Sequence, residues 1–341
     1  MQMLMEVAKY LSWLAIPVGL LCIADDWFVR PRRQTIAAPQ EAPDPPAISV
    51  AYHTLPILIG AAVLRLLVAE KLDFSAVLFG ITVLTGLVWA VDALILSRRR
   101  AAVAKAAGKD LSAIREPGTV DYARSFFPVA LVVLVLRSFI FEPFRIPSDS
   151  MMPTLYDGDF IFVSKFSYGL RLPVSNTLII PTGTPQRGDV IVFRLPPNPK
   201  MNYIKRLVGL PGDKIRVDEN NLLYVNGQLM AQNPGPIYSG PKQNLWNYAG
   251  VNTAFEQLGS KNHRVMFANG PVKTGEWVVP PHHYFFMGDN RNNSKDSRYQ
   301  DDSEAPGFVP EQNLVGKAVR IWLNLDTRDG PQWRRIGNKI E

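Results

Sequence analysis

Four apolar stretches near the amino terminus constrain this chain of 341 residues more than any other feature. A helix needs about 20 mostly apolar residues to cross the hydrocarbon core of a bilayer. The second and third stretches reach that length, and the outer two reach it only with flanking residues. A short apolar run can also be a buried helix or an uncleaved signal-like anchor. The sequence predicts four transmembrane helices, roughly at Tyr10 to Ala24, Ile48 to Ala69, Phe74 to Leu96 and Phe126 to Phe141.

Basic residues in the loops predict the orientation of these helices, because Lys and Arg beside a span are retained on the cytoplasmic side. Only Lys9 precedes the first stretch, and only Lys71 lies between the second and the third. Basic residues are frequent after the first and third stretches: Arg30, Arg32, Arg33, Arg98, Arg99, Arg100, Lys105, Lys109, Arg115 and Arg124. The amino terminus and everything after Phe141 are therefore predicted to lie outside the cytoplasm.

Two arginines, Arg65 and Arg137, lie within the predicted spans. A charge inside a membrane can mark a functional site. Snorkelling to the interface, or a contact within the helix bundle, is the simpler interpretation. Between the first two spans, the proline-rich stretch from Ala37 to Pro46 cannot sustain a helix and is predicted to be an extended cytoplasmic linker.

The sequence pattern changes at Glu142 to short β-branched and aromatic runs separated by Gly, Pro, Asn and Asp, which indicates a mainly β domain. Asn226-Gly227 is a strong hairpin signal. The stretch from Ala231 to Lys273 is polar and weakly periodic, which predicts a loop-rich inserted β subdomain. Strands are expected at Asp159 to Val163, Asp189 to Phe193, Lys214 to Val217, Leu222 to Val225, Trp277 to Val279, Tyr284 to Met287 and Val319 to Leu323.

The two patterns together predict how the chain is organised. Residues 1–125 are predicted to form a membrane anchor region of about three spans with their cytoplasmic loops. Residues 126–141 are predicted to be the last transmembrane span. Residues 142–341 are expected to form the β domain outside the cytoplasm, with residues 231–273 as its loop-rich insertion.

Composition and residue spacing exclude several classes of function. Cys22 is the only cysteine, so no intrachain disulfide can form. The net charge of +7 is not gathered into basic patches with interleaved aromatics, so nucleic acid is not an expected partner. His282 and His283 are adjacent, but no further ligands follow at a suitable spacing, so no metal is predicted. These two histidines and His263 are expected at surface or turn positions.

Two motifs in the β domain can carry chemistry. The first, from Arg145 to Leu155, reads Arg-Ile-Pro-Ser-Asp-Ser-Met-Met-Pro-Thr-Leu, and the second, from Tyr203 to Arg206, reads Tyr-Ile-Lys-Arg. A serine needs a base within hydrogen-bond reach to act as a nucleophile. Lysine can be that base when burial lowers its pKa and leaves a neutral amine. Lys205 has apolar neighbours, although an exposed strand lysine paired with a carboxylate is the commoner case.

These motifs resemble the serine-lysine motifs of the bacterial signal peptidase I family, membrane-anchored enzymes that remove signal peptides from exported proteins. A third stretch, from Gly288 to Arg298, resembles the family's final signature block. The three blocks occur in the family's order, and the similarity runs from about Phe139 to the end of the chain. Two features depart from the pattern: the best-known Gram-negative members have two amino-terminal spans rather than four, and some members have a disulfide in the outer domain.

The resemblance implies a role for each matching residue. Ser150 matches the nucleophile, and Lys205 matches the general base. Ser148 matches the hydroxyl that joins the Ser150 N–H in the oxyanion hole, and Ser294 matches the hydroxyl that orients the lysine. Such preorganised donors stabilise the charge that develops on the scissile carbonyl. No cofactor is implied, since proteolysis by a serine and a lysine requires none.

Further residues are implied to support the site or to choose the substrate. Asp296 and Arg298 match a structural ion pair beside the site. A shallow apolar pocket would accept alanine and exclude larger side chains. The resemblance implies that such pockets are lined by residues that, taken alone, are more typical of ordinary core: Phe144, Ile146, Met151, Leu155, Tyr203 and Ile204.

The fold implied by the resemblance is a set of N-terminal transmembrane α-helices followed by a mainly β catalytic domain of antiparallel sheets. The implied function is that of a serine endopeptidase that cleaves N-terminal signal peptides from exported pre-proteins after small residues of the Ala-X-Ala type. The implied location is the bacterial inner membrane, with several spans and the catalytic domain on the periplasmic side. The expected partners are signal peptides, membrane lipid and the protein export machinery.

Three rival interpretations remain. A self-cleaving serine-lysine repressor would need a helical DNA-binding domain where the spans lie. A catalytically silent, membrane-tethered β module that binds exported proteins would not need both the serine and the lysine. A channel or transporter would need more ionisable groups within the spans than this chain has.

Overall fold

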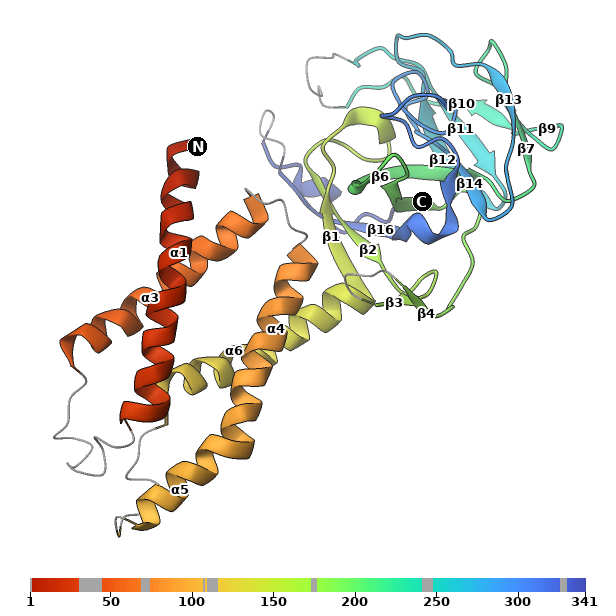
Figure 1. Cartoon of the computed structure of the whole chain (residues 1–341). Helices are drawn as coiled ribbons and strands as arrows, with labels where there is room; N and C mark the ends of the chain where they lie inside the picture. The colour runs from red at the N-terminus through yellow and green to blue at the C-terminus, as the bar shows by residue number, and fades with distance from the viewer. Residues whose placement is uncertain are drawn as a thin grey trace. The chain divides into compact units, whose positions relative to one another are not determined.

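The computed structural model describes residues 2–30, 45–68, 74–106, 108, 116–172, 177–240, 248–325 and 330–341. The chain forms two compact units, Met1–Leu136 and Arg137–Glu341. The first is helical and the second is mainly β (Figure 1). This is the class of fold that the sequence predicted.

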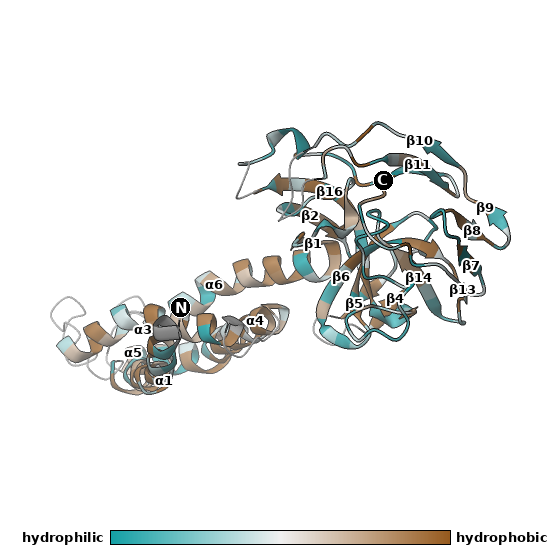
Figure 2. Ribbon diagram, turned by 90° about the horizontal axis from the view of Figure 1, so that it is seen from above, coloured by the Kyte–Doolittle hydropathy of each residue, from teal (hydrophilic) through white to brown (hydrophobic). Residues whose placement is uncertain are grey.

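The helical unit contains four long apolar helices at the four predicted stretches. In the hydropathy colouring of Figure 2 these helices are largely brown, the colour of hydrophobic residues. Each is long and apolar enough to cross a membrane: Glu6–Val29, Pro46–Leu66, Phe74–Ala106 and Gly118–Ile140. Their regular parts are α1 (Gln2–Ala24), α3 (Pro46–Val68), α4 (Phe74–Val91), α5 (Ser97–Ala106) and α6 (Gly118–Val135). Short π-helical turns extend three of them: η1 (Asp25–Val29), η2 (Asp92–Leu96) and η4 (Leu136–Ile140).

The last apolar helix differs from its predicted limits at both ends. It begins at Gly118 rather than near Phe126, because polar residues continue the helix ahead of the apolar run. The helical turn ends at Ile140, and Phe141 already belongs to the first strand. Apolarity marks the part of a helix that suits lipid, whereas backbone hydrogen bonds decide where the helix begins and ends.

Arg65, one of the two charged residues in the predicted spans, contacts its own helical unit. Its Nη1 donates a hydrogen bond of 3.0 Å to Ser12 Oγ, and its guanidinium lies 5.6 Å from the centre of the Trp13 ring. This is the bundle contact that the simpler interpretation expected. The predicted proline-rich linker lies almost entirely outside the described residues.

The β unit is built on an antiparallel seven-stranded sheet with the strand order β1-β2-β16-β5-β6-β14-β15. Non-neighbouring parts of the chain therefore lie side by side, with β16 between β2 and β5. The strands are β1 (Phe141–Arg145), β2 (Asp159–Ser164), β5 (Val190–Leu195), β6 (Asn198–Gly209), β14 (His283–Met287), β15 (Val309–Pro310) and β16 (Leu314–Asn324).

Three smaller sheets complete the β unit. One consists of β13 (Gly275–Val278), β7 (Lys214–Val217), β8 (Leu223–Val225) and β9 (Gln228–Leu229). Its β8–β9 turn is the predicted hairpin, and both turn residues, Asn226 and Gly227, have positive φ, as a tight hairpin turn requires. The second consists of β10 (Gln232–Pro234), β11 (Thr253–Leu258) and β12 (Lys261–Met266), and the third of β3 (Leu170–Arg171) and β4 (Leu178–Ile180).

The predicted insertion at residues 231–273 thus carries a small sheet of its own. Its two longer strands, β11 and β12, pair in register from Thr253↔Met266 to Leu258↔Lys261. Alternate residues of these strands face the interior. This alternation places buried side chains of the insertion against the candidate site described below.

Candidate active site

Ser150 lies in a short 3₁₀ turn, η5 (Asp149–Met151), which follows strand β1. Asn290 holds this turn at two points. Its side-chain amide donates to the carbonyl of Asp149 at 3.2 Å, and its backbone N–H donates to the carbonyl of Ser150 at 3.1 Å. The next residue, Met151, is fully buried. The backbone of the turn is therefore fixed on both sides, while Ser150 itself remains partly exposed.

Lys205 comes to the same place from the middle of β6. Its Nζ lies 2.8 Å from Ser150 Oγ and donates to the carbonyl of Ile204 at 3.0 Å. Side chains two residues apart on a strand share a face, and the Lys205 amine lies 5.2 Å from the centre of the Tyr203 ring. Only 4% of Lys205 is exposed. The sequence could not establish this burial, and the commoner case of an exposed strand lysine does not apply.

Burial changes the protonation of Lys205. It lowers the pKa of the ammonium from 10.5 to about 8, against the opposing influence of the Asp296 and Asp289 carboxylates. Removal of water disfavours the charged form, and nearby negative charges favour it. At neutral pH a useful fraction of the amine is therefore uncharged. An uncharged amine 2.8 Å from a serine hydroxyl can accept its proton.

Two further predicted hydroxyls lie near this pair. Ser148 Oγ is exposed and lies 3.3 Å from Ser150 Oγ, on the side open to solvent. Ser294 is buried, and its hydroxyl is among the groups that lower the pKa of the Asp296 carboxyl. It packs over Gly288. A Cβ atom added to Gly288 would meet both the Ser294 side chain and, at 2.5 Å, the Ser150 carbonyl oxygen. Ser294 is thus close to the Ser150 backbone, but the described hydrogen bonds of Lys205 go to Ser150 and Ile204 instead.

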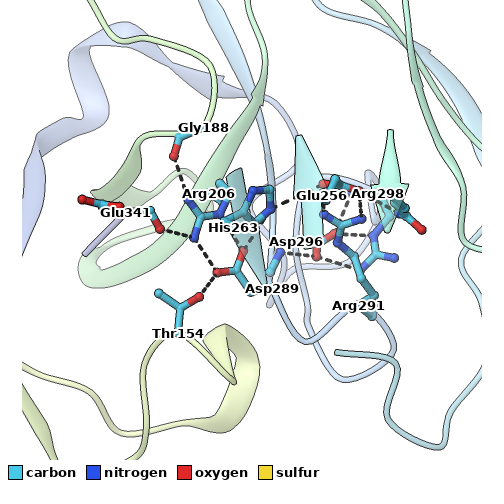
Figure 3. A network of polar contacts seen from close by, with 12 residues as sticks. Thr154, Gly188, Arg206, Glu256, His263, Asp289, Arg291, Asp296, Arg298 and Glu341 are labelled. Atoms are coloured by element: carbon cyan, nitrogen blue, oxygen red, sulfur yellow. Dashed lines mark hydrogen bonds and ion pairs between the residues drawn. The ribbon is translucent and has the colours of Figure 1, made fainter. Parts of the chain in front are cut away.

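A buried network of charged side chains lies next to the pair (Figure 3). Arg206, the residue after Lys205, donates two hydrogen bonds of 2.7 Å to the carboxylate of Asp289. The same carboxylate accepts a hydrogen bond from Thr154. Arg206 also donates to the carbonyls of Gly188 at 2.8 Å and Glu341 at 2.9 Å. Asp289 therefore joins the segment that carries the serine to the strand that carries the lysine.

The predicted ion pair of Asp296 and Arg298 is present and fully buried. Arg298 donates from Nε and Nη2 to the two carboxylate oxygens at 2.8 Å each. The Gly288 N–H donates to the same carboxylate at 2.9 Å. Arg298 also donates to the carbonyl of Arg291 at 2.6 Å. Burial acts to raise the pKa of Asp296, but Arg298 and the hydrogen bonds from Gly288 and Ser294 together lower it below its ordinary value.

A third buried pair, Glu256 and Arg291, connects the insertion to this network. The Arg291 guanidinium binds both oxygens of the Glu256 carboxylate, one of them at 2.6 Å. Burial acts to raise the pKa of Glu256, but the charges and hydrogen bonds of Arg291 and His263 together lower it below its ordinary value. Since Glu256 lies on β11, this pair ties the small sheet of the insertion to the loop after β14.

The predicted surface or turn position of His263 is wrong. His263 lies on β12 with 4% of its surface exposed, and its Nε2 is 3.4 Å from a Glu256 oxygen and 3.9 Å from an Asp289 oxygen. Burial, followed by the Arg206 charge, lowers the pKa of the imidazole. The alternation of β12 turns His263 and Val265 inward together. The prediction holds for His282, whose side chain is 86% exposed.

Five of the six predicted pocket residues share one apolar cluster. Ile146, Met151, Leu155 and Ile204 are buried in it, and Phe144 packs against it. Tyr203 belongs to a neighbouring cluster, and its hydroxyl donates to the carbonyl of Glu304 at 2.7 Å. This apolar cluster lies directly beside the serine turn and the lysine strand, because Met151 follows Ser150 and Ile204 precedes Lys205.

Several residues of the site were not predicted. Some of them lie next to predicted residues in the three motifs, and others, such as Ile340 of the same apolar cluster, come from distant parts of the chain. These residues are Thr154, Arg206, Asp289, Asn290, Glu256, His263 and Ile340. Thr154, Arg206, Asp289 and Asn290 lie within the quoted motif blocks, so the blocks themselves were the available signal. Glu256 and Ile340 had no signal, since single residues of this kind are common anywhere in a chain.

Among the described residues, no group of three or more His, Cys, Asp and Glu side chains is placed to hold a metal ion. A partly exposed serine thus lies beside a buried lysine on a β unit that follows apolar helices, and some serine peptidases use lysine in place of histidine. The chain belongs to the signal peptidase family, peptidase S26, whose model matches residues 119–323.

Curated relatives support the same assignment. The chain is 44% identical over 290 residues to "Signal peptidase I" of Pseudomonas aeruginosa, with 78% of this chain and 98% of that protein covered. It is 45% identical over 270 residues to that of Pseudomonas fluorescens, covering 74% and 93%, respectively. It is 35% identical over 316 residues to that of Haemophilus influenzae, covering 76% and 88%. The expected family resemblance and the expected class of enzyme are confirmed.

Proposed function

We propose that the protein is a signal peptidase that uses Ser150 as nucleophile and Lys205 as general base. The observation that carries this proposal is the distance of 2.8 Å between Lys205 Nζ and Ser150 Oγ, within reach for direct proton transfer. The pKa of about 8 for the buried amine supports it, because the base must be uncharged when the serine attacks.

The reaction proceeds in two stages. Lys205 accepts the proton of Ser150 as Oγ attacks the scissile carbonyl carbon. The resulting oxyanion accepts hydrogen bonds from the backbone N–H of Ser150 and the hydroxyl of Ser148, which lies on the open side of the serine. The Lys205 ammonium then gives its proton to the departing amine, leaving an acyl-enzyme. Lys205 next deprotonates a water that attacks the ester, and the proton returns to Ser150 as the peptide acid leaves.

The residues around Ser150 and Lys205 hold these two side chains in position and do not themselves react. Asn290 fixes the backbone on both sides of the attacking oxygen, and Asp289 joins the serine segment to the lysine strand. A displacement of about 1 Å between reacting groups can cost roughly a hundredfold in rate. Ser294 packs over Gly288 beside the carbonyl oxygen of Ser150, and we assign it the lysine-orienting role that the family resemblance implies.

Substrate choice follows from the apolar cluster beside the serine. Ile146, Met151 and Leu155 are fully buried and already closely packed, so a substrate side chain laid against Phe144 and Ile204 has little space. Small residues such as alanine fit such a surface, and larger ones require the core to move. This is the residue type that precedes the cleavage point of a signal peptide.

The location follows from the apolar helices and the charges around them. Four helices suited to crossing a membrane precede the β unit, and the basic residues after the first and third favour an orientation with the amino terminus and the β unit outside the cytoplasm. The protein is thus proposed as a multi-pass protein of the bacterial inner membrane with its active site on the periplasmic side. Signal peptides, lipid and the export machinery would meet it there.

The test is cleavage of a purified pre-protein with an Ala-X-Ala site by the full-length protein in detergent. Ser150→Ala and Lys205→Ala should each lower kcat by about a thousandfold or more. Lys200→Ala, an exposed lysine on the same strand, is the matched control and should be fully active. Full activity of either dyad variant would remove that residue from the mechanism. A folded wild type that binds pre-protein without cleaving it would favour the silent binding module.

A further inference from the structure

A pocket of about 200 Å³ lies inside the helical unit, between the end of α1 and the junction of α4 with α5. It is lined by Asp26, Trp27, Phe28, Leu96, Arg99, Arg100 and Val103. These residues come from η1 on one side and from the adjoining η2 and α5 on the other, and more than sixty positions of sequence separate the two sides. The family model begins at residue 119, so the pocket lies outside the part of the chain that the model matches.

Two hydrogen-bond donors of this pocket have no partner among the described residues. The indole Nε1 of Trp27 is buried and donates to nothing. Arg99 is exposed and has no ion pair, whereas Arg100 binds both oxygens of Asp92, one at 2.9 Å. A buried donor without an acceptor costs free energy, so its site favours a ligand that supplies one. Both unused groups, an N–H and a guanidinium, are donors without acceptor capacity, and they call for an anion.

Asp26, the carboxylate among the lining residues, already has partners outside the lining. Asp26 pairs with Arg30 at 3.0 Å and accepts hydrogen bonds of 2.8 Å from both the N–H and the hydroxyl of Thr119. The N–H of Thr119 belongs to the first turn of α6, where the positive end of the helix dipole adds to the compensation. Asp26 is thus held by Thr119 and by Arg30, which also lies 3.7 Å from Asp25. Of the two arginines that line the pocket, Arg99 is the one without an ion pair to a described residue.

The walls and the position of the pocket indicate what kind of anion fits. Phe28, Leu96 and Val103 give it apolar walls, and Phe28 and Val103 are exposed. It lies where two apolar helices end in basic residues, the level at which a span meets the lipid headgroups. Tryptophan is enriched at this level, and basic pockets between transmembrane helices on the cytoplasmic side bind anionic headgroups.

We propose that this pocket holds the headgroup phosphate of an anionic phospholipid, bound by Arg99 and the Trp27 indole with an acyl chain along Phe28 and Val103. A liquid water occupies about 30 Å³, so the pocket has room for a phosphate with its glycerol but not for a large headgroup. The bound lipid would join α1 to α5 at the headgroup level. This site is independent of the proposed peptidase chemistry.

The test is native mass spectrometry of the full-length protein, purified in detergent with phosphatidylglycerol or phosphatidylcholine as the added lipid. Arg99→Ala should retain roughly fivefold less phosphatidylglycerol than Arg98→Ala, because the loss of one basic contact to an anionic lipid costs about that factor. Arg98 is the matched control, since it is an adjacent exposed arginine that does not line the pocket.

A second pair of variants tests the indole. Trp27→Phe removes the indole N–H while keeping an aromatic ring and should also lower retention, whereas Trp13→Phe, on the exposed part of α1, should not. Size-exclusion profiles and thermal unfolding show that each variant is folded. Equal losses in Arg98→Ala and Arg99→Ala, or equal retention of phosphatidylcholine, would mean general surface attraction and overturn the proposal. Displacement of the lipid by inorganic phosphate would show a free-anion site instead and would overturn it too.

Discussion

The guanidinium of Arg206 donates two hydrogen bonds of 2.7 Å to the carboxylate of Asp289, and both side chains are fully removed from solvent. Such a pair contributes little net stability compared with a well-packed apolar pair, since both charges lose their hydration. The main effect of this pair is to hold two segments of the chain in position. Arg206 follows Lys205, and Asp289 precedes Asn290, so this pair fixes the register between the strand of Lys205 and the loop that holds the Ser150 turn.

The pH dependence of cleavage should report Lys205. Because the base must be neutral and its pKa is about 8, kcat/KM should rise with pH and level off above that value. The measurement is kcat/KM for one peptide substrate at a series of pH values on both sides of 8. A flat profile, or one that falls as pH increases through this range, would contradict the assignment.

Lys205→Met should make the β unit more stable while it abolishes cleavage. The folded pKa is about 8 and the ordinary value is 10.5, so below pH 8 the native state holds a buried charge at a cost of about 1–3 kcal/mol. The unfolded chain binds more protons between these values. Wild-type stability therefore rises with pH across this window, and the advantage of the variant disappears above it.

Thermal unfolding of the full-length protein in detergent, at one pH below 8 and one above 10.5, measures this difference. Lys200→Met, on the exposed part of the same strand, is the control and should change the midpoint very little at either pH. A variant that is less stable than the wild type at the lower pH would show that the buried Lys205 charge does not destabilise the native state.

Asp289→Asn should destabilise the β unit and move the pH profile of cleavage to lower pH. The substitution leaves Arg206 as an uncompensated buried charge, which costs about 3–5 kcal/mol. It also removes a negative charge that raises the pKa of Lys205. The midpoint of the kcat/KM profile should fall accordingly. Asp302→Asn, at an exposed ion pair with Lys295, should leave both quantities unchanged, and a midpoint that rises in Asp289→Asn would contradict this account.

Gly288→Ala should lower kcat by about a hundredfold with a smaller effect on KM. The added methyl group would meet the Ser294 side chain and lie 2.5 Å from the carbonyl oxygen of Ser150. The serine backbone, which Asn290 holds at 3.1 Å, must then move. Steady-state kinetics of the variant test this, with Gly80→Ala as the control because its added methyl group meets nothing within 4 Å. Unchanged kcat would show that the Ser150 turn tolerates displacement.

Much of the fold could be predicted because its signals are local. Strand alternation placed Lys214 to Val217 and the Asn226-Gly227 hairpin correctly, and continuous apolar runs located four helices. The last helix begins at Gly118, ahead of the apolar run, because polar residues continue the helix and supply the flanking residues that the short run needed. The predicted surface or turn position of His263 was wrong for a related reason. A single polar residue on a strand gives no sign of its face until its partners are known.

The sequence by itself determined the order of the parts, the residue types available for chemistry and the family motifs that single out Ser150 and Lys205. Only the tertiary structure decided that Lys205 is buried, that its amine lies 2.8 Å from a serine 55 positions away, and that its pKa is about 8. Proton affinity depends on solvent exclusion and on charges such as Asp289 and Asp296 brought in from distant segments. These quantities exist only when the sheets have assembled, because no local stretch contains both the base and the walls that exclude water from it.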